Sequence, residues 1–413
     1  MPDERLALDG GTPAVRGPVS RHLIGPEERR AVLAVIDRAI ADGTAFDRYT
    51  GTEVDAYETE FARWIGTKHA TAVSSGTAAI HTALAALDLE PGSEVVCSPI
   101  TDPGAVMPVL WNQCIPVFAD TAPGSYNVSA ATVEAALSDR TAAIVVGHIA
   151  GEPCAIAEIA ALAARHNLPL IEDCAQSHGA TWRGRAVGTF GTLAAFSMMS
   201  GKHHTSGGQG GMVVTDREDL YWEAKRFGDR GKPFHSDEAT NLRLGCNYRM
   251  TELAAAMGRV QLKRLPEIIA RRRAMAARLA GRLARTRAFS FGTIPDGAAP
   301  TWWFLRIKVD LGRLSADKAQ VAKALAAEGV PAAATYTTLI HEQRWFLDRR
   351  TLGRSSLPWS LPGVRPIDYA GACPNAAQAA REHLFCQFNE SMDEATIDGM
   401  GWAFEKVERA YGR

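Results

Sequence analysis

The chain has 413 residues, 46% of them hydrophobic and 22% charged, and its formal net charge is −1. The length predicts two domains, and the near-neutral charge argues against binding to nucleic acid. No apolar run is long enough to predict a membrane-spanning helix. The N-terminus lacks the basic segment and apolar stretch of a secretory signal, so we expect a cytoplasmic protein.

Seven cysteines are scattered along the chain, an odd number without a Cys-x-x-Cys pair. This spacing argues against a zinc site. We therefore expect reduced, buried thiols and no bound metal, as in a cytosolic protein. The cysteines are Cys97, Cys114, Cys154, Cys174, Cys246, Cys373 and Cys386.

The N-terminal half of the chain predicts an alternation of strands and helices. Residues 1–25 have turn composition and little periodicity, which indicates an extended arm. Two helices are expected next, and the apolar spacing then switches repeatedly between the strand and helix periods. The predicted helices cover 27–41, 52–65, 77–87, a short stretch from 129, and 156–166, and the predicted strands cover 69–73, 94–98, 115–118, 142–148 and 168–172.

This alternation is typical of an α/β fold with a mostly parallel central sheet and helices on both faces. Further strands are predicted at 193–197 and 212–215, and a helical tract over 251–285 leads to a second domain. In that domain we expect a strand at 302–309, a helix at 315–328 and a mostly helical tail from 381. The predicted division is an arm (1–25), a large domain (26–265) and a smaller C-terminal α+β domain (266–413).

Lys202 stands between an apolar strand-like run and a glycine-rich turn, and Asp173 ends the strand predicted over 168–172. Ligands of such sheets bind beyond the carboxyl ends of the strands. A lysine on a glycine-flanked loop and an aspartate at a strand end are what pyridoxal 5′-phosphate (PLP) chemistry requires. The lysine forms a Schiff base, and the aspartate keeps the pyridine nitrogen protonated. For Asp173 alone, a structural salt bridge is the alternative.

A phosphate site is predicted where Ser75-Gly76-Thr77 joins a strand to a helix. A helix N-terminus offers free backbone N–H groups, and glycine lets a phosphate approach closely. Helix capping by Ser75 or Thr77 is the alternative explanation. At Lys202, desolvation and nearby cations would lower the pKa of the amine, and the adjoining His203 and His204 either contribute to this or only pack the loop.

In these segments the chain resembles the DegT/StrS-type sugar aminotransferases, which are PLP-dependent enzymes of fold type I. The resemblance covers most of residues 25–265, and its five motifs follow one another in the order typical of the family. They are residues 75–78, 171–179, Phe196-Ser197 with Lys202, 210–213, and 245–254.

The resemblance implies a role for each matching residue. Lys202 would carry the cofactor and shuttle protons, Asp173 would pair with the pyridine nitrogen, and Gln176 would lie near the cofactor's phenolic oxygen. The phosphate would be held by Gly76, Thr77 and Ser197, and by Asn247 from a neighbouring subunit, so a homodimer with shared active sites is implied. On the substrate side the resemblance places His203, Tyr336 and His341, whereas Trp302 and Trp303 are expected in the core of the small domain.

Three features depart from the family pattern. Asp102 follows Pro99-Ile100-Thr101, where members usually carry a flat residue that stacks on the cofactor ring. The glycine turn contains Gln209 instead of a glutamate, and the C-terminal proline motif is blurred around 373–376. With these changes PLP binding is still expected, but the usual substrate is in question.

The resulting hypothesis is an aminotransferase. The amino donor would be L-glutamine or L-glutamate, and the acceptor a nucleotide-linked keto-sugar or a keto-cyclitol, in amino-sugar, aminocyclitol or antibiotic biosynthesis. One alternative is a PLP-dependent dehydratase, epimerase or other elimination enzyme acting on a sugar-like substrate. Another is a PLP-binding sensor without turnover.

Overall fold

The computed structural model describes residues 4–17, 20–46 and 51–413. Its centre is a seven-stranded sheet with the order β1-β9-β8-β5-β4-β2-β3. Strand β9 runs antiparallel to both of its neighbours, and the remaining neighbours are parallel, which confirms the predicted mostly parallel sheet. The strands are β1 (His69–Val73), β2 (Glu94–Cys97), β3 (Ile115–Phe118), β4 (Thr141–Gly147), β5 (Leu170–Asp173), β8 (Leu193–Ser197) and β9 (Gly211–Thr215).

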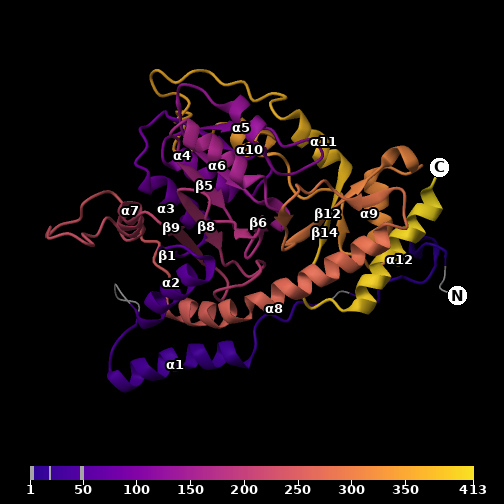
Figure 1. Ribbon diagram of the computed structural model, residues 1–413, viewed down its shortest axis with the longest axis horizontal. Coiled ribbons are helices and arrows are strands. Elements are labelled where there is room, and N and C mark those ends of the chain that lie inside the picture. The colour runs from indigo at the N-terminus through magenta and orange to yellow at the C-terminus, as the bar shows by residue number, and fades with distance from the viewer. Residues whose placement is uncertain (1–3, 18–19, 47–50) are drawn as a thin grey trace.

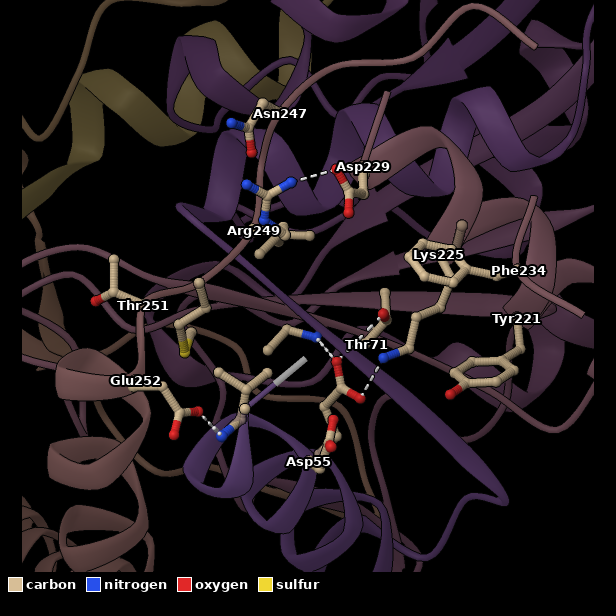
Figure 2. Close-up of a pocket in the computed structure, with 18 of the residues that line it drawn as sticks. Asp55, Thr71, Tyr221, Lys225, Asp229, Phe234, Asn247, Arg249, Thr251 and Glu252 are labelled. Carbon is tan, nitrogen blue, oxygen red and sulfur yellow. Dashed lines mark hydrogen bonds and ion pairs between the residues drawn. The ribbon is translucent and has the colours of Figure 1, made fainter. Parts of the chain in front are cut away.

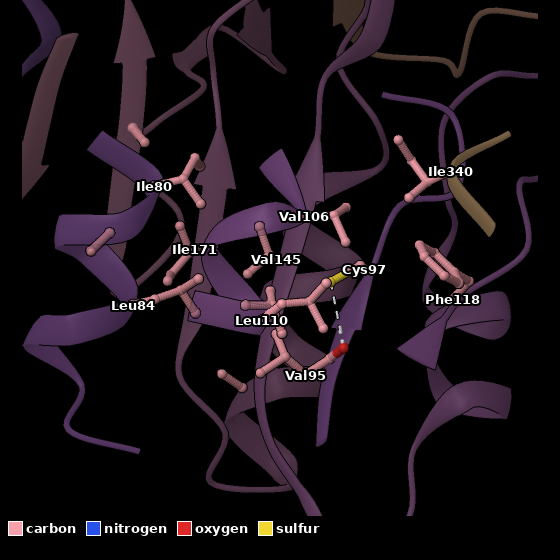
Figure 3. Packing of buried hydrophobic residues seen from close by; sticks show 14 of the residues in the cluster. Ile80, Leu84, Val95, Cys97, Val106, Leu110, Phe118, Val145, Ile171 and Ile340 are labelled. Atoms are coloured by element: carbon pink, nitrogen blue, oxygen red, sulfur yellow. Dashed lines mark hydrogen bonds between the residues drawn. The ribbon is translucent and has the colours of Figure 1, made fainter. Parts of the chain in front are cut away.

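Both faces of this sheet are buried, because successive side chains of each strand enter opposite cores. In β2, Val95 and Cys97 join one apolar cluster and Val96 joins the other. Figure 3 shows the first cluster, in which Ile80 and Leu84 of a helix pack over strand residues. Helices α3 (Gly76–Ala86), α4 (Met107–Trp111) and α11 (Pro374–Glu382) contribute to that face, and α2 (Thr52–Ile65), α5 (Ala130–Ala136) and α6 (Ile156–Arg165) to the other.

A long helix, α8 (Glu252–Leu283), joins the two halves of the molecule (Figure 1). Thr251 caps its N-terminus by accepting a hydrogen bond from the Ala254 N–H at 3.3 Å. Its first half packs against α1 (Pro26–Asp42) and α2, and its second half packs against α12 (Glu394–Tyr411). The expected boundary at residue 265 therefore falls inside one continuous helix.

The C-terminal half contains a four-stranded antiparallel sheet of order β10-β12-β14-β13. The tail from residue 381 was expected to be mostly helical, and α12 fills most of it, but strand β14 near its start was not predicted. Leu384 and Cys386 enter the small core at a spacing of two residues, which is a strand period. The elements are β10 (Phe289–Phe291), β12 (Phe304–Val309), β13 (Ala332–Ala333), β14 (His383–Gln387) and α9 (Lys318–Ala327), followed by α12.

The chain between residues 340 and 379 returns from this small sheet to the large one. Phe346, Trp359 and Tyr369 belong to the same apolar cluster as Phe118 of β3. The Tyr369 hydroxyl donates a hydrogen bond to the Pro116 carbonyl at 2.8 Å. The predicted small domain of 266–413 thus includes a segment that completes the core of the large one.

The shorter elements connect these layers. In the described ranges, no helix combines the length and apolarity needed to cross a bilayer. The connecting elements are η1 (Ala7–Asp9), η2 (Pro103–Ala105), η3 (Ile149–Gly151), η4 (Leu311–Arg313), η5 (Ile340–Glu342), α7 (Glu218–Gly228), α10 (Arg344–Leu347), β6 (Thr181–Trp182), β7 (Arg185–Ala186) and β11 (Ala298–Ala299).

Candidate active site

The predicted cofactor residues lie at one edge of the large sheet. Asp173 is the last residue of β5, and Ser197 is the last residue of β8, its parallel neighbour. Lys202 follows in the loop between β8 and β9, and Gly76 opens α3 directly after β1. Because β5, β8, β9 and β1 are consecutive in the sheet, these residues are brought together from separate parts of the sequence.

The Lys202 side chain is buried, with only 6% of the residue exposed. Burial lowers the pKa of its amine to about 8, and the negative charges of Asp173 and Asp102 limit that decrease. The amine nitrogen lies 3.6 Å from the centroid of the Trp303 ring. A lysine with this pKa is partly neutral near pH 8, as a nucleophile or base must be.

Asp173 supplies a buried carboxylate whose charge acts on this lysine. One of its oxygens accepts a hydrogen bond from the Ala175 N–H at 3.0 Å. Burial raises the pKa of the carboxyl, whereas the Ala175 N–H and the charge of Lys202 lower it. A carboxylate in this environment is stabilised further by a cationic partner, such as a protonated ring nitrogen.

The start of α3 lies against Ser197 at the end of β8. The Ser75 hydroxyl accepts a hydrogen bond from the Ala78 N–H at 3.0 Å, so Ser75 is the N-cap. The N–H groups of Gly76 and Thr77 precede the intrahelical hydrogen bonds and are therefore available to an anion. A Cβ atom at Gly76 would lie 2.5 Å from the Ser197 Cβ, which means that only glycine permits this close approach.

These features fit PLP. A partly neutral buried lysine, a buried carboxylate and a helix N-terminus beside a serine correspond to its aldehyde, ring nitrogen and phosphate, respectively. Capping by Ser75 is present as well, so the capping and phosphate explanations are compatible at this helix.

Gln176 and Tyr336 meet beside this group. The Gln176 side-chain oxygen accepts a hydrogen bond from the Ala150 N–H at 2.9 Å, and its amide donates to the Tyr336 hydroxyl at 2.9 Å. Burial raises the pKa of Tyr336, and the carboxylates of Asp102 and Asp173 act in the same direction. Tyr336, expected on the substrate side, is thus linked to a predicted cofactor residue.

His203 is fully buried, so the structure does not support the substrate contact expected of it. Its Nε2 lies 3.1 Å from the Thr301 carbonyl oxygen. The ring of His178 lies 5.7 Å from that of His203 and 5.1 Å from that of His204, and the Tyr57 hydroxyl lies 2.6 Å from His204 Nε2. Burial lowers the pKa of all three histidines, which pack the lysine loop as neutral rings.

His341 and Asp102, two further residues singled out in the sequence, differ in exposure. His341 is buried, with its ring 5.3 Å from that of Phe118, and its role toward a substrate stays a prediction. Asp102 is exposed and caps η2 by accepting a hydrogen bond from the Gly104 N–H at 2.8 Å. The position that usually stacks on the ring therefore carries an exposed carboxylate.

A hydrogen-bond network of Glu172 and His148 adjoins Asp173. The sequence did not predict this network. Glu172 accepts hydrogen bonds from the N–H groups of residues 188, 190 and 191 and lies 3.1 Å from His148 Nε2. The His148 N–H donates to the Asp173 carbonyl. Ligand atoms of His148, Glu172 and Cys174 lie within 4.8 Å of one another, but the Glu172 oxygens are already occupied by these donors.

Asn247 lies elsewhere in the chain, in a cavity of 440 Å³ that Figure 2 shows. It pairs with Asp229 through an isolated β-bridge, and Arg249 and Glu252 line the same cavity. The described residues that line this cavity include none of the other predicted cofactor residues, which are Gly76, Thr77, Asp173, Gln176, Ser197 and Lys202. The expected contact of Asn247 with a neighbouring subunit's phosphate stays a prediction.

Comparisons with known proteins identify the family of the chain. The model of the DegT/DnrJ/EryC1/StrS aminotransferase family matches residues 28–361. GDP-perosamine synthase of Caulobacter vibrioides is 34% identical over 306 residues, which are 73% of this chain and 80% of that protein. GDP-perosamine synthase of Escherichia coli O157:H7 is 36% identical over 226 residues, 55% of this chain and only 62% of that protein. The structure of an aminotransferase from Psychrobacter cryohalolentis superposes with a TM-score of 0.82 at 30% identity, covering 95% of this chain and 99% of that one.

Proposed function

Because the chain belongs to the DegT/DnrJ/EryC1/StrS aminotransferase family, whose members depend on PLP, we propose that it is a sugar aminotransferase. The amino donor is L-glutamate or L-glutamine, and the acceptor is a keto-sugar, with a nucleotide-linked sugar preferred over a keto-cyclitol. The observation that carries this proposal is the buried Lys202 beside Asp173 at the carboxyl edge of the sheet. The preference for a nucleotide-linked sugar rests on the similarity to the two GDP-perosamine synthases.

The residues of the chain have separable tasks in this reaction. When bound, PLP supplies an electron sink for the carbon that gains or loses the amino group. Asp173 would hold the positive charge of the ring nitrogen, and the N-terminus of α3 with Ser197 would hold the phosphate. Lys202 anchors the cofactor and then takes up and returns a proton at its Nζ atom, which its lowered pKa permits.

The donor half-reaction tests the proposal. Purified protein supplied with PLP is mixed with L-glutamate or L-glutamine, and the visible absorbance and the release of the corresponding 2-keto acid are recorded. We expect the spectrum of the amine form of the cofactor and one keto acid per site, with none from the Lys202→Ala variant. Keto-sugars and keto-cyclitols added afterwards should restore the first spectrum, as in ping-pong kinetics.

Two outcomes contradict an aminotransferase. Bound PLP that reacts with neither donor favours a sensor. Loss of a hydroxyl group, or inversion of a carbon, in a sugar substrate without amino transfer favours the elimination or epimerase alternative.

We further propose a homodimer in which Asn247 completes the phosphate site of the neighbouring subunit. Lys202→Ala and Asn247→Ala proteins, each impaired alone, are mixed under conditions of subunit exchange. A mixed dimer has one site that carries both the intact lysine and the intact asparagine, so about a quarter of the wild-type activity should return. If the mixture stays as inactive as its parts, the shared site is rejected.

A further inference from the structure

Trp303 contacts the reactive lysine directly, although the sequence predicted it in the core of the small domain. Its ring centroid lies 3.6 Å from the Lys202 amine, and its indole N–H donates a hydrogen bond to the Gly201 carbonyl at 2.7 Å. Its neighbour Trp302 is buried in the small core as expected. The indole of Trp303 thus contacts the lysine and also holds the backbone beside it.

The backbone around Trp303 is fixed by the large domain. The Trp303 N–H donates to the Ala150 carbonyl at 2.9 Å, and the Thr301 N–H donates to the Gly151 carbonyl at 2.9 Å. Gly151 has a φ of 80°, and a Cβ there would lie 2.8 Å from the Trp303 nitrogen. Only glycine allows this approach. The position of the indole is therefore held by η3.

Arg272 of α8 holds the same turn from the opposite side. Its guanidinium donates to the Trp302 carbonyl at 2.7 Å and to the Phe388 carbonyl at 3.1 Å, and it pairs with Glu390. The residue is almost fully buried. Together with the contacts to η3, these bonds make Trp303 part of a rigid wall beside the lysine.

The charge of Lys202 has few other partners in this wall. Among the residues that the structure describes, no ion pair within 4.0 Å joins the Lys202 amine to a carboxylate, and Asp173 and Asp102 act on it only through longer-range attraction. The face of an indole is negative and attracts an ammonium group, whereas it does not attract a neutral amine in this way. Trp303 therefore favours the protonated lysine, in opposition to burial.

We propose that Trp303 is a catalytic residue, whose indole face receives the Lys202 ammonium each time the amine takes up a proton and whose N–H keeps the loop in place at Gly201. The catalytic part of this inference rests on the aminotransferase function proposed above. The contact itself is a property of the chain and can be tested without cofactor or substrate.

The test is the pH dependence of Lys202 labelling in the cofactor-free protein. A small amine-acylating reagent is applied over a range of pH, and acylation of Lys202 is quantified by mass spectrometry of its peptide. Replacing Trp303 by Leu removes the aromatic face, so the midpoint should fall by about 0.5–1 pH unit. Trp303→Phe keeps an aromatic face and should retain the wild-type midpoint. Trp302→Phe serves as the control in the neighbouring position.

The same variants test the catalytic role in the PLP-loaded enzyme. For Trp303→Leu we expect kcat to fall at least about tenfold with KM changed less than about threefold, because the interaction acts on the proton-transferring amine. If Trp303→Leu does not fold, as judged by thermal melting, Trp303→Met replaces it. A midpoint that stays unchanged without the aromatic face, or that moves equally in the Phe and Leu variants, overturns the proposal. So does an unchanged kcat.

An inactive wild type would leave the labelling result intact, because labelling needs no turnover. A failure of the proposed function is therefore distinguishable from a failure of the contact between Trp303 and Lys202. If the wild type is inactive, a shifted midpoint of Lys202 labelling still supports the contact. The catalytic role of Trp303 is then rejected together with the aminotransferase function.

Discussion

Two buried lysines of this chain have opposite surroundings. The Lys406 side chain is fully buried, and its amine donates to a Glu328 oxygen at 2.7 Å and to the Thr12 carbonyl at 3.0 Å. Glu328 also accepts the N–H groups of Ala7 and Ala14, so this pair fastens the N-terminal arm to the small domain. Lys202 is buried to a similar degree, but its amine faces an indole ring.

The difference shows what separates a structural lysine from a reactive one. A buried charge is tolerated when a counter-charge and hydrogen bonds replace its water, as at Lys406. At Lys202 no close counter-charge replaces the lost water, and burial lowers the pKa of the amine to about 8. A site that needs a neutral amine has to leave that amine without a close carboxylate, at a cost in stability.

The largest effect should follow from Lys202→Met. Turnover should fall by about 10⁴-fold or more, because the variant lacks the amine that we propose anchors the cofactor and moves the proton. The cofactor-free variant should nevertheless unfold at a higher temperature than the wild type, because an incompletely solvated amine is replaced by an apolar side chain of similar length. Activity assays and thermal melting measure the two effects. A variant less stable than the wild type would falsify this comparison of the two lysines.

Lys406→Met should instead lower the stability of the protein. Removing one partner of a buried ion pair leaves Glu328 uncompensated, which costs about 3–5 kcal/mol of the free energy of unfolding. Chemical denaturation measures this loss. The matched control is the double variant Lys406→Met with Glu328→Gln, which removes both charges and should recover part of the stability. If the double variant is as unstable as the single one, the pair is not the source of the effect.

The sequence alone predicted the candidate site around Lys202 because the signals of that site are local. Lys202 and Asp173 each stand within a short motif at the end of a strand, and the repeated switch of the apolar spacing between the strand and helix periods predicts a mostly parallel sheet with helices on both faces. Glycine next to Ser75 likewise indicates a close approach of the backbone. These features depend on neighbours in sequence, and the structure contains them in the predicted order.

What escaped the sequence depends on distant contacts. Trp303 meets Lys202 across about one hundred residues, and no pattern near either residue signals it. Strand β14 is five residues long and lies between helical segments, so its period was missed. The Thr301 carbonyl, which lies 3.1 Å from Nε2 of the buried His203, likewise belongs to a distant part of the chain. In each case tertiary packing decides the outcome.

Stability should also depend on pH through Lys202. Its pKa is lowered from 10.5 to about 8 in the folded protein, so between these values the unfolded chain binds more protons. The free energy of unfolding of the cofactor-free protein should therefore rise with pH across this window, by roughly 3 kcal/mol at most. Denaturation of wild type and Lys202→Met at several pH values measures the contribution, which the variant should lack. Parallel curves for the two proteins would contradict it.

The smallest effect concerns the two carboxylates whose charges raise the pKa of Lys202. Asp173 is the stronger of the two carboxylates that raise the pKa of Lys202 against burial, and Asp102 is the weaker. Asp173→Asn should therefore lower the midpoint of Lys202 labelling by about 0.5 pH unit, and Asp102→Asn, at an exposed position, by less. The comparison is sharpened by Glu328→Gln, which removes a carboxylate that pairs with the other lysine. That change should leave the Lys202 midpoint where it is, because the reactivity of Lys202 is set by its own surroundings. A midpoint that shifts equally in all three variants would instead indicate a response to net charge.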